Sequence, residues 1–206
     1  MNGQSSAGFS GLDPDRILSS VEAHLGVFLD GVITPYNSYI NRVFGLVDED
    51  ENAYIAKFYR PGRWNREAIA AEHRLIADCA RADIPVIAPL AGISAPDGTI
   101  GESAGILFAV FPRVRARTFD IYGDDDWIRT GSLIGRLHAV AGPRSDPARL
   151  RCTPAGTSAR YLADFRENRL VHPDCADDFF GVADEALSLI EPLFDELDPA
   201  AFRRIH

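Results

Sequence analysis

Residues 53–59 read AYIAKFY and residues 66–81 read REAIAAEHRLIADCAR, and these two stretches decide how the chain folds. The first has the β-branched and aromatic composition of a strand, but Lys57 interrupts its apolar residues. In the second, apolar residues recur at helical spacing, and Glu72 falls on the same stripe. A carboxylate on an apolar helix face needs a partner, and Lys57 on the preceding strand is the nearest candidate.

An ammonium on a strand beside a carboxylate on the next helix is the arrangement that kinase-type phosphotransferases use to hold nucleotide phosphates. Two plainer interpretations stay open: an edge strand whose lysine reaches solvent, and an ion pair without any ligand. The ion pair alone does not explain why a lysine faces inward. We therefore expect Lys57 and Glu72 to form a close, buried ion pair on the inner face of a nucleotide-binding lobe.

The composition is that of an ordinary globular protein. The 206 residues are 46% hydrophobic and 25% charged, enough for one domain or two small lobes. A formal charge of −9 disfavours a general nucleic-acid binder. The three widely spaced cysteines predict a reduced, cytoplasmic setting. The N-terminus does not have the pattern of a signal peptide, and no apolar run reaches the roughly 18 residues of a membrane span, so no membrane partner is expected.

The first half of the chain reads as a β-rich lobe. After a Gly/Ser-rich tail over 1–11, a helix is expected from Asp13 to a stop at Gly31, with Phe28 on its apolar face. The stretches INRVFGLV and AYIAKFY predict a hairpin around the acidic turn DEDEN. Asn65 can cap a helix to about Arg81, and GILFAVF predicts a central strand buried on both faces.

The second half of the chain reads as mostly helical. Helices are expected over about 126–140, 158–169 and 177–197. The expected organisation is a tail over 1–11, an N-lobe over 12–112, and a hinge with a helical lobe over 113–206. A β-rich half followed by a helical half predicts an α+β, two-lobed protein.

Several stretches closely resemble the bacterial stress response kinase A family of Ser/Thr protein kinases: NSYINRVF, IAKFYRPGRW, AAEHRLIADC, IPVIAPL and FAVFPRV. The similarity extends from about Tyr36 to the C-terminus, and KFYRPGRW and AVFP are its most specific parts. The resemblance implies a protein-kinase-like fold of the aminoglycoside phosphotransferase and choline kinase type. In that fold the chain would supply a β-rich N-lobe and a partial helical C-lobe.

The same resemblance assigns roles toward ATP. Lys57 would contact the α- and β-phosphates, and Glu72 would orient Lys57. The segment from Phe111 through Arg113 to Val114 would be the hinge whose backbone binds the adenine edge.

Three further residues, Asn37, Ser38 and Tyr39, would occupy the loop that covers the phosphates. That loop has no G-x-G-x-x-G pattern, so its small polar side chains and ordinary amides make a weaker anion cradle.

The family's catalytic loop begins His-Gly-Asp, and His206, the last residue of the sequence, matches its first position. The catalytic Asp and the two Mg²⁺ ligands of the family have no counterpart within the 206 residues. Positioned base catalysis is worth about 10²–10⁴-fold, and phosphoryl transfer also relies on metal ions. The expectation is a truncated piece of a kinase, or a shortened homologue that keeps only nucleotide-side features, inactive as this chain and with no catalytic or metal-binding residue of its own.

The first functional interpretation is an ATP-dependent protein Ser/Thr kinase of the stress response type. The alternatives are a small-molecule kinase of the same fold, acting on homoserine, choline or an aminoglycoside, and a non-catalytic nucleotide-binding or regulatory module. ATP is the expected partner, with Mg²⁺ as its ion, and the sequence does not name the phosphoacceptor. Self-association is also expected through apolar C-lobe side chains: Phe179, Phe180, Leu187, Ile190, Leu193 and Phe194.

Overall fold

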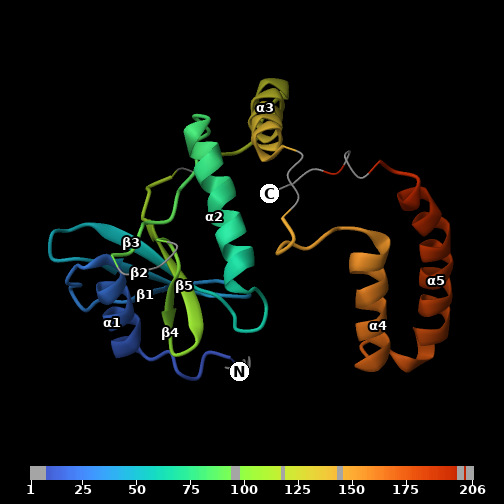
Figure 1. Cartoon of the computed structure of the whole chain (residues 1–206), viewed down its shortest axis with the longest axis horizontal. Coiled ribbons are helices and arrows are strands. Elements are labelled where there is room, and N and C mark those ends of the chain that lie inside the picture. Colours follow the sequence, from blue (N-terminus) through green and yellow to red (C-terminus); the bar gives the residue numbers. More distant parts are fainter. Residues whose placement is uncertain (1–7, 94–97, 117–118, 143–145, 199–201, 203–206) are drawn as a thin grey trace. The chain divides into compact units, whose positions relative to one another are not determined.

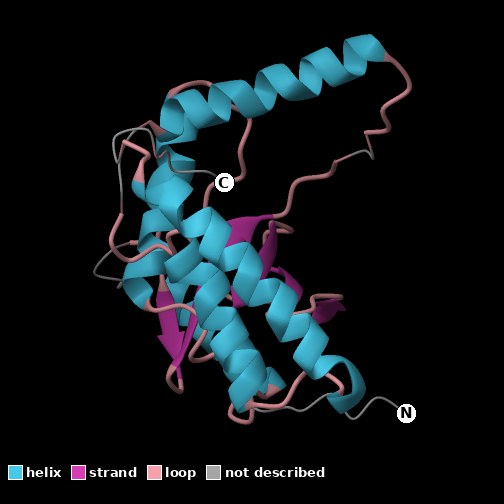
Figure 2. Ribbon diagram, turned by 90° about the vertical axis from the view of Figure 1, so that its right-hand side faces the viewer, coloured by secondary structure: helices cyan, strands magenta, loops and turns pink. Residues whose placement is uncertain are grey.

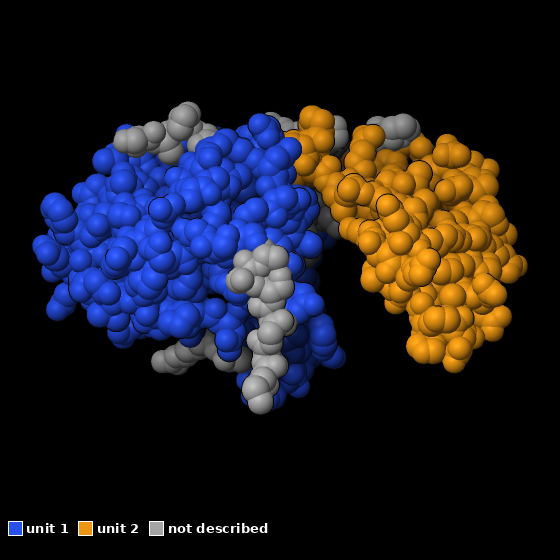
Figure 3. All heavy atoms as spheres, turned by 90° about the horizontal axis from the view of Figure 1, so that it is seen from below, with its two compact units in different colours: residues 1–141, 206 blue, residues 142–205 orange. Residues whose placement is uncertain are grey.

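A computed structural model describes residues 8–93, 98–116, 119–142, 146–198 and 202 (Figure 1). The chain divides into two compact units, residues 1–141 and residues 142–205, coloured separately in Figure 3. None of the helices in the described ranges has the length and apolar content needed to cross a membrane.

The first unit is built on a five-stranded antiparallel sheet, magenta in Figure 2. Its strands are β1 (Thr34–Tyr36), β2 (Arg42–Val47), β3 (Ala53–Phe58), β4 (Gly101–Ser103) and β5 (Ile106–Pro112). Their order across the sheet is β1-β2-β3-β5-β4. The predicted hairpin of β2 and β3 is confirmed, and β5 is an interior strand, as predicted.

Helix α1 (Pro14–Leu25) begins at the predicted cap, where the Asp13 carboxylate accepts a hydrogen bond from the Arg16 N–H. Its predicted end at Gly31 is wrong. The helix ends at Gly26, which has a left-handed φ of 72° and donates its N–H to the Glu22 carbonyl. Phe28 therefore lies beyond the helix and is 74% exposed instead of packed on its apolar face.

The two faces of the sheet are covered by different helices. On the α1 face the buried side chains are Phe9, Ile17, Val21, Leu46, Ala56, Phe58, Ile106, Phe108 and Val110. Phe9 belongs to this core, so the expected loose tail over 1–11 does not hold at that position. Helix α2 (Arg66–Arg81), with the predicted cap at Asn65, packs on the other face around Tyr59, Ile69, Ile100 and Ala109. The central strand β5 is thus buried on both faces, as predicted.

Helix α3 (Asp124–Ala141) also belongs to the first unit, because it packs against α2. Its Arg136 guanidinium donates to the Ala82 and Asp83 carbonyls, at 3.3 and 2.9 Å, just beyond the end of α2. The predicted helix over 126–140 is confirmed with a slightly earlier start.

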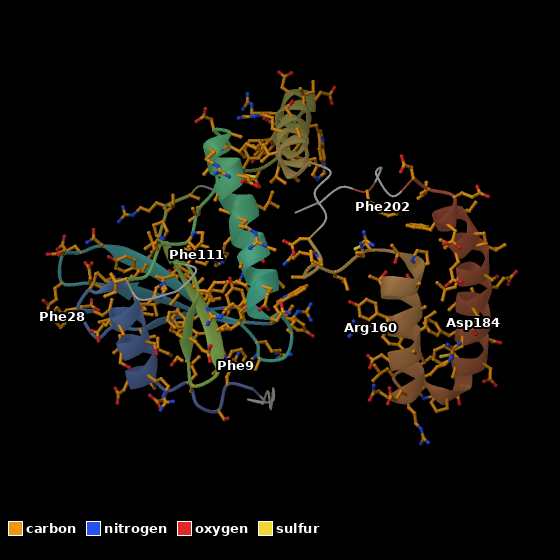
Figure 4. The ribbon with its side chains drawn as sticks, in the orientation of Figure 1. Phe9, Phe28, Phe111, Arg160, Asp184 and Phe202 are labelled. Atoms are coloured by element: carbon orange, nitrogen blue, oxygen red, sulfur yellow. The ribbon has the colours of Figure 1, made fainter. Side chains whose placement is uncertain are left out.

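The second unit contains a short π-helical turn (Pro154–Ser158), α4 (Ala159–Glu167) and α5 (Pro173–Asp195). The two helices contact each other through stacked Phe165 and Phe179 rings and an ion pair between Arg166 and Asp184. Figure 4 labels Asp184. Helix α5 begins four residues earlier than predicted, with Pro173 in its first turn. Several of its large apolar side chains are exposed, and self-association through them stays a prediction.

The β2–β3 turn is held by a buried carboxylate. Asp48 accepts hydrogen bonds from the Asp50 and Asn52 N–H groups, from the Asn52 amide, and from the Tyr54 hydroxyl at 2.7 Å. Burial opposes the charged form, but these hydrogen bonds outweigh it and lower the pKa of Asp48 below its ordinary 3.8. Burial, together with the nearby Asp48 carboxylate, raises the pKa of Tyr54 to about 12.

Asp48→Asn should therefore destabilise the protein at pH 7, and the difference from the natural protein should shrink as the pH falls. A carboxyl whose folded pKa is lowered stabilises the fold above its unfolded pKa, and this contribution disappears as the pH drops through the folded pKa. Urea unfolding of both proteins at pH 7 and pH 3 measures the effect. Asp50→Asn in the same turn is the control and should be nearly neutral; an equal loss at both pH values for Asp48→Asn would contradict the account.

Candidate functional site

The register of the sheet places Lys57 on the face that α2 covers. Lys57 lies opposite Ala109 of β5, and Ile55 lies opposite Phe111. Cross-strand partners project from the same face, and residues two apart on a strand do so as well. Ile55, Lys57, Ala109 and Phe111 therefore form one surface on the α2 side, where Figure 4 labels Phe111.

The predicted ion pair forms. The Lys57 Nζ lies 3.7 Å from Glu72 Oε1. The predicted burial of the pair is wrong, since the two side chains are 28% and 36% exposed. The buried residues around this turn of α2 are Ala71 and His73, so Glu72 lies at the margin of the apolar stripe. Because 3.7 Å exceeds the roughly 2.7–2.9 Å of a strong charged hydrogen bond, the pair leaves the ammonium able to bind a further anion.

Lys57 is the only lysine among the 21 lysine and arginine residues of the sequence. Lysine offers a compact point charge with three donors, whereas arginine offers a planar fork. The other 20 of these residues are arginines, and the one lysine lies in the candidate site. Counting lysines could have singled out this residue before any structural comparison.

A third group, Tyr59, contacts the lysine. The Lys57 Nζ lies 4.7 Å from the centroid of the Tyr59 ring, within cation–π range. The buried Tyr59 hydroxyl lies 3.4 Å from His73 Nε2, and His73 Nδ1 lies 2.8 Å from Thr99 Oγ1. Burial raises the pKa of Tyr59, and the Glu72 charge adds to the effect. Sequence reasoning missed Tyr59, although its position two residues after Lys57 on the same strand face was the available signal.

A cavity of about 670 Å³ opens on the same surface of the sheet. Its lining comes from β1, β3, β5, the connector before β4 and the segment after β5: Tyr36, Ile55, Ile87, Phe111, Pro112, Arg113, Val114, Arg115 and Ala116. The volume lies within the roughly 300–1,000 Å³ typical of small-molecule pockets. The apolar side chains of the sheet offer a wall for the face of a flat heteroaromatic ring. The backbone of the segment after β5 offers amide and carbonyl groups for the polar edge of that ring.

The eight predicted site residues separate into three groups. Lys57 and Glu72 form the ion pair and do not line the cavity. Phe111, Arg113 and Val114 line the cavity. Asn37, Ser38 and Tyr39 do not line it and lie in the turn between β1 and β2.

That turn lies at the Lys57 end of the sheet, because Val43, just after it, is opposite Lys57. Within the turn, Ser38 Oγ accepts the Asn41 N–H, and Asn41 Oδ1 accepts the Arg60 N–H, at 3.3 Å in both cases. His206, the predicted first residue of the catalytic-loop motif, lies outside the described residues. Within the described ranges, no group of three His, Cys, Asp or Glu side chains could hold a metal ion.

Comparison with known proteins gives one family. The model of the phosphotransferase enzyme family, APH, matches residues 32–206. Stress response kinase A of Escherichia coli (strain K12) is 38% identical over 130 residues, which are 63% of this chain and 38% of that protein. Serine/threonine protein kinase RdoA of Salmonella typhimurium is 35% identical over 136 residues, 66% of this chain and 40% of that protein. The chain thus spans well under half the length of these relatives.

Two solved structures share the fold. Amicoumacin kinase hAmiN, solved with AMP-PNP, Ca²⁺ and Ami, superimposes with a TM-score of 0.66 and 18% identity over 95% of this chain and 57% of that one. Spectinomycin phosphotransferase APH(9)-Ia, solved with ADP and spectinomycin, gives a TM-score of 0.57 and 14% identity over 90% of this chain and 59% of that one. The α+β, aminoglycoside phosphotransferase-like fold expected from the sequence is therefore confirmed.

Removal of either charge of the Lys57–Glu72 pair should barely change stability. Half-exposed pairs contribute up to about 1 kcal/mol, whereas breaking a fully buried pair costs about 3–5 kcal/mol. We expect Glu72→Gln and Lys57→Met each to lower the free energy of unfolding by about 1 kcal/mol or less, measured in urea. Arg129→Met, which breaks the exposed pair with Asp126 in the same unit, is the control. A loss of about 3 kcal/mol at Glu72 alone would show that the pair is desolvated in solution.

Proposed function

Because this chain belongs to the phosphotransferase enzyme family, we propose that its first unit is the nucleotide-binding lobe of an ATP-dependent protein Ser/Thr kinase of the stress response type. The observation that carries the proposal is the shared surface of Lys57 and the cavity. One sheet face presents an apolar pocket and a half-exposed ammonium, and ATP has an aromatic base at one end and phosphates at the other.

Each residue of the site has a role in binding ATP. The adenine ring would lie in the cavity against Ile55 and Phe111, and the backbone from Phe111 to Val114 would bind its polar edge. The Lys57 ammonium would bind the phosphates and neutralise part of their charge, while Glu72 holds the ammonium on the inner face. The turn carrying Asn37, Ser38 and Tyr39 would approach the phosphates from the same end of the sheet.

Magnesium would supply charge neutralisation at the β- and γ-phosphates of bound ATP. Among the described residues no three His, Cys, Asp or Glu side chains gather into a group that could hold a metal ion, so the role of this lobe is derived from Lys57 and the cavity. Those groups bind and orient a nucleotide, and binding is the activity that we assign to them.

The relatives favour a protein as the phosphoacceptor. Those that are 35–38% identical carry the names stress response kinase A and serine/threonine protein kinase RdoA. The two small-molecule kinases are 14–18% identical and support the fold alone. A small-molecule kinase is the second candidate, and a non-catalytic nucleotide-binding module is the third. Phosphate transfer to a generic protein substrate or to an aminoglycoside, measured on the full-length gene product, separates the three.

Calorimetric titration with ATP tests nucleotide binding directly. Lys57→Met should weaken binding about tenfold or more, because hydrogen bonds to charged groups are worth about 1.5–3 kcal/mol. Ile55→Trp should abolish binding by filling the cavity while leaving Lys57 in place. Arg66→Met removes a comparably half-exposed cation elsewhere in the same unit and should leave affinity unchanged. Unchanged binding in both site variants would refute the assignment.

A further inference from the structure

We propose that Tyr59 is a positioning residue for Lys57: its ring face holds the ammonium in place for nucleotide phosphates. This inference rests on the proposed function and extends it to a residue outside the predicted site. It starts from two contacts of the ammonium. Lys57 Nζ lies 3.7 Å from Glu72 Oε1 and 4.7 Å from the Tyr59 ring centroid. Lys57 is therefore placed between a carboxylate and an aromatic face.

The Glu72 contact alone does not fix the lysine. At 3.7 Å it is a loose pair, and both side chains are partly exposed, so solvent screens it. A lysine has about 2 kcal/mol of rotamer entropy to lose when its ammonium binds a phosphate. A second contact that already limits the lysine rotamers before phosphate binds lowers this entropy cost. An aromatic face suits that purpose, because it attracts the cation without using up its N–H donors.

Core packing and a backbone hydrogen bond hold Tyr59 itself in place. The side chain is 3% exposed and packs with Ile69, Ile100 and Ala109. Its backbone N–H donates to the Leu107 carbonyl at 2.8 Å.

The Tyr59 hydroxyl lies 3.4 Å from Nε2 of the buried His73, and His73 Nδ1 lies 2.8 Å from Thr99 Oγ1. A tyrosine needed only for core packing would not have to present its face to the lysine. The contact with His73, whose other ring nitrogen contacts Thr99, helps to keep the ring in the orientation that does so.

The single lysine gives a direct test. Protein grown with lysine labelled with ¹³C at Cε gives one side-chain methylene signal, from Lys57. Protons above an aromatic face are shifted upfield by the ring current. Without nucleotide, Tyr59→Phe should retain the upfield position, because the ring remains, and Tyr59→Leu should lose it. Tyr54→Leu removes a tyrosine from the opposite face of β3 and should leave the signal in place.

Nucleotide titration is the second readout. Tyr59→Leu should weaken ATP binding about three- to tenfold, the effect of one cation–π contact, and Tyr59→Phe should stay within about twofold. An upfield Lys57 signal together with no ATP binding in the natural protein would uphold the positioning and refute the proposed function. Tight ATP binding with identical Lys57 signals and affinities in Tyr59→Phe and Tyr59→Leu would uphold the function and overturn the positioning.

A packing defect is distinguished by a second pair of variants. Because Tyr59 is in the core, its replacement by leucine can disturb the fold. Folding of Tyr59→Leu is therefore checked first, by comparing its far-ultraviolet circular dichroism with that of the natural protein. If it does not fold, Tyr59→pentafluorophenylalanine replaces it, since that ring keeps the shape of phenylalanine and reverses the electrostatic character of its face. Relative to Tyr59→Phe, the fluorinated ring should displace the Lys57 signal and weaken ATP binding. Equal signals and equal affinities would overturn the proposal.

Discussion

The position of one ammonium group is the constraint on which the site depends. Lys57 is the single lysine of the chain, and it lies on a strand with well-paired neighbours on both sides. Its charge cannot be buried without a large desolvation cost, so the structure leaves it partly exposed between a carboxylate and an aromatic face. A cation in that state has capacity for a further anion, and the proposed binding of nucleotide phosphates rests on this capacity.

The rest of the first unit fixes that ammonium. Helix α1 covers one face of the sheet with a purely structural core, so β3 and β5 cannot slip without exposing it. Helix α2 covers only part of the other face, where it brings Glu72 to the lysine and leaves room for the cavity beside Ile55 and Phe111. The same strands therefore supply both the apolar pocket and the charge, and their register sets the distance between the two.

Local patterns predicted the elements well, because the β2–β3 hairpin and α2 have clear alternation, capping and helical spacing. They failed where a choice depended on tertiary packing. Two glycines could have ended α1, and only the folded chain shows that Gly26 does so. Helical spacing placed Glu72 on the apolar stripe but could not show that His73 takes the buried position. Tyr59 was missed because a tyrosine in a strand is ordinary, and its role depends on contacts with distant residues.

Covalent labelling with an acyl-phosphate derivative of ATP tests directly whether the Lys57 ammonium lies against the phosphates of a bound nucleotide. Such a reagent acylates a lysine amine that lies against the phosphates, and Lys57 is the only lysine that it could modify. We expect one acyl group on Lys57 by peptide mass spectrometry, lost when unmodified ATP is added in excess. Labelling that ATP does not suppress, or an unlabelled Lys57 under conditions that modify a known kinase, would contradict this expectation.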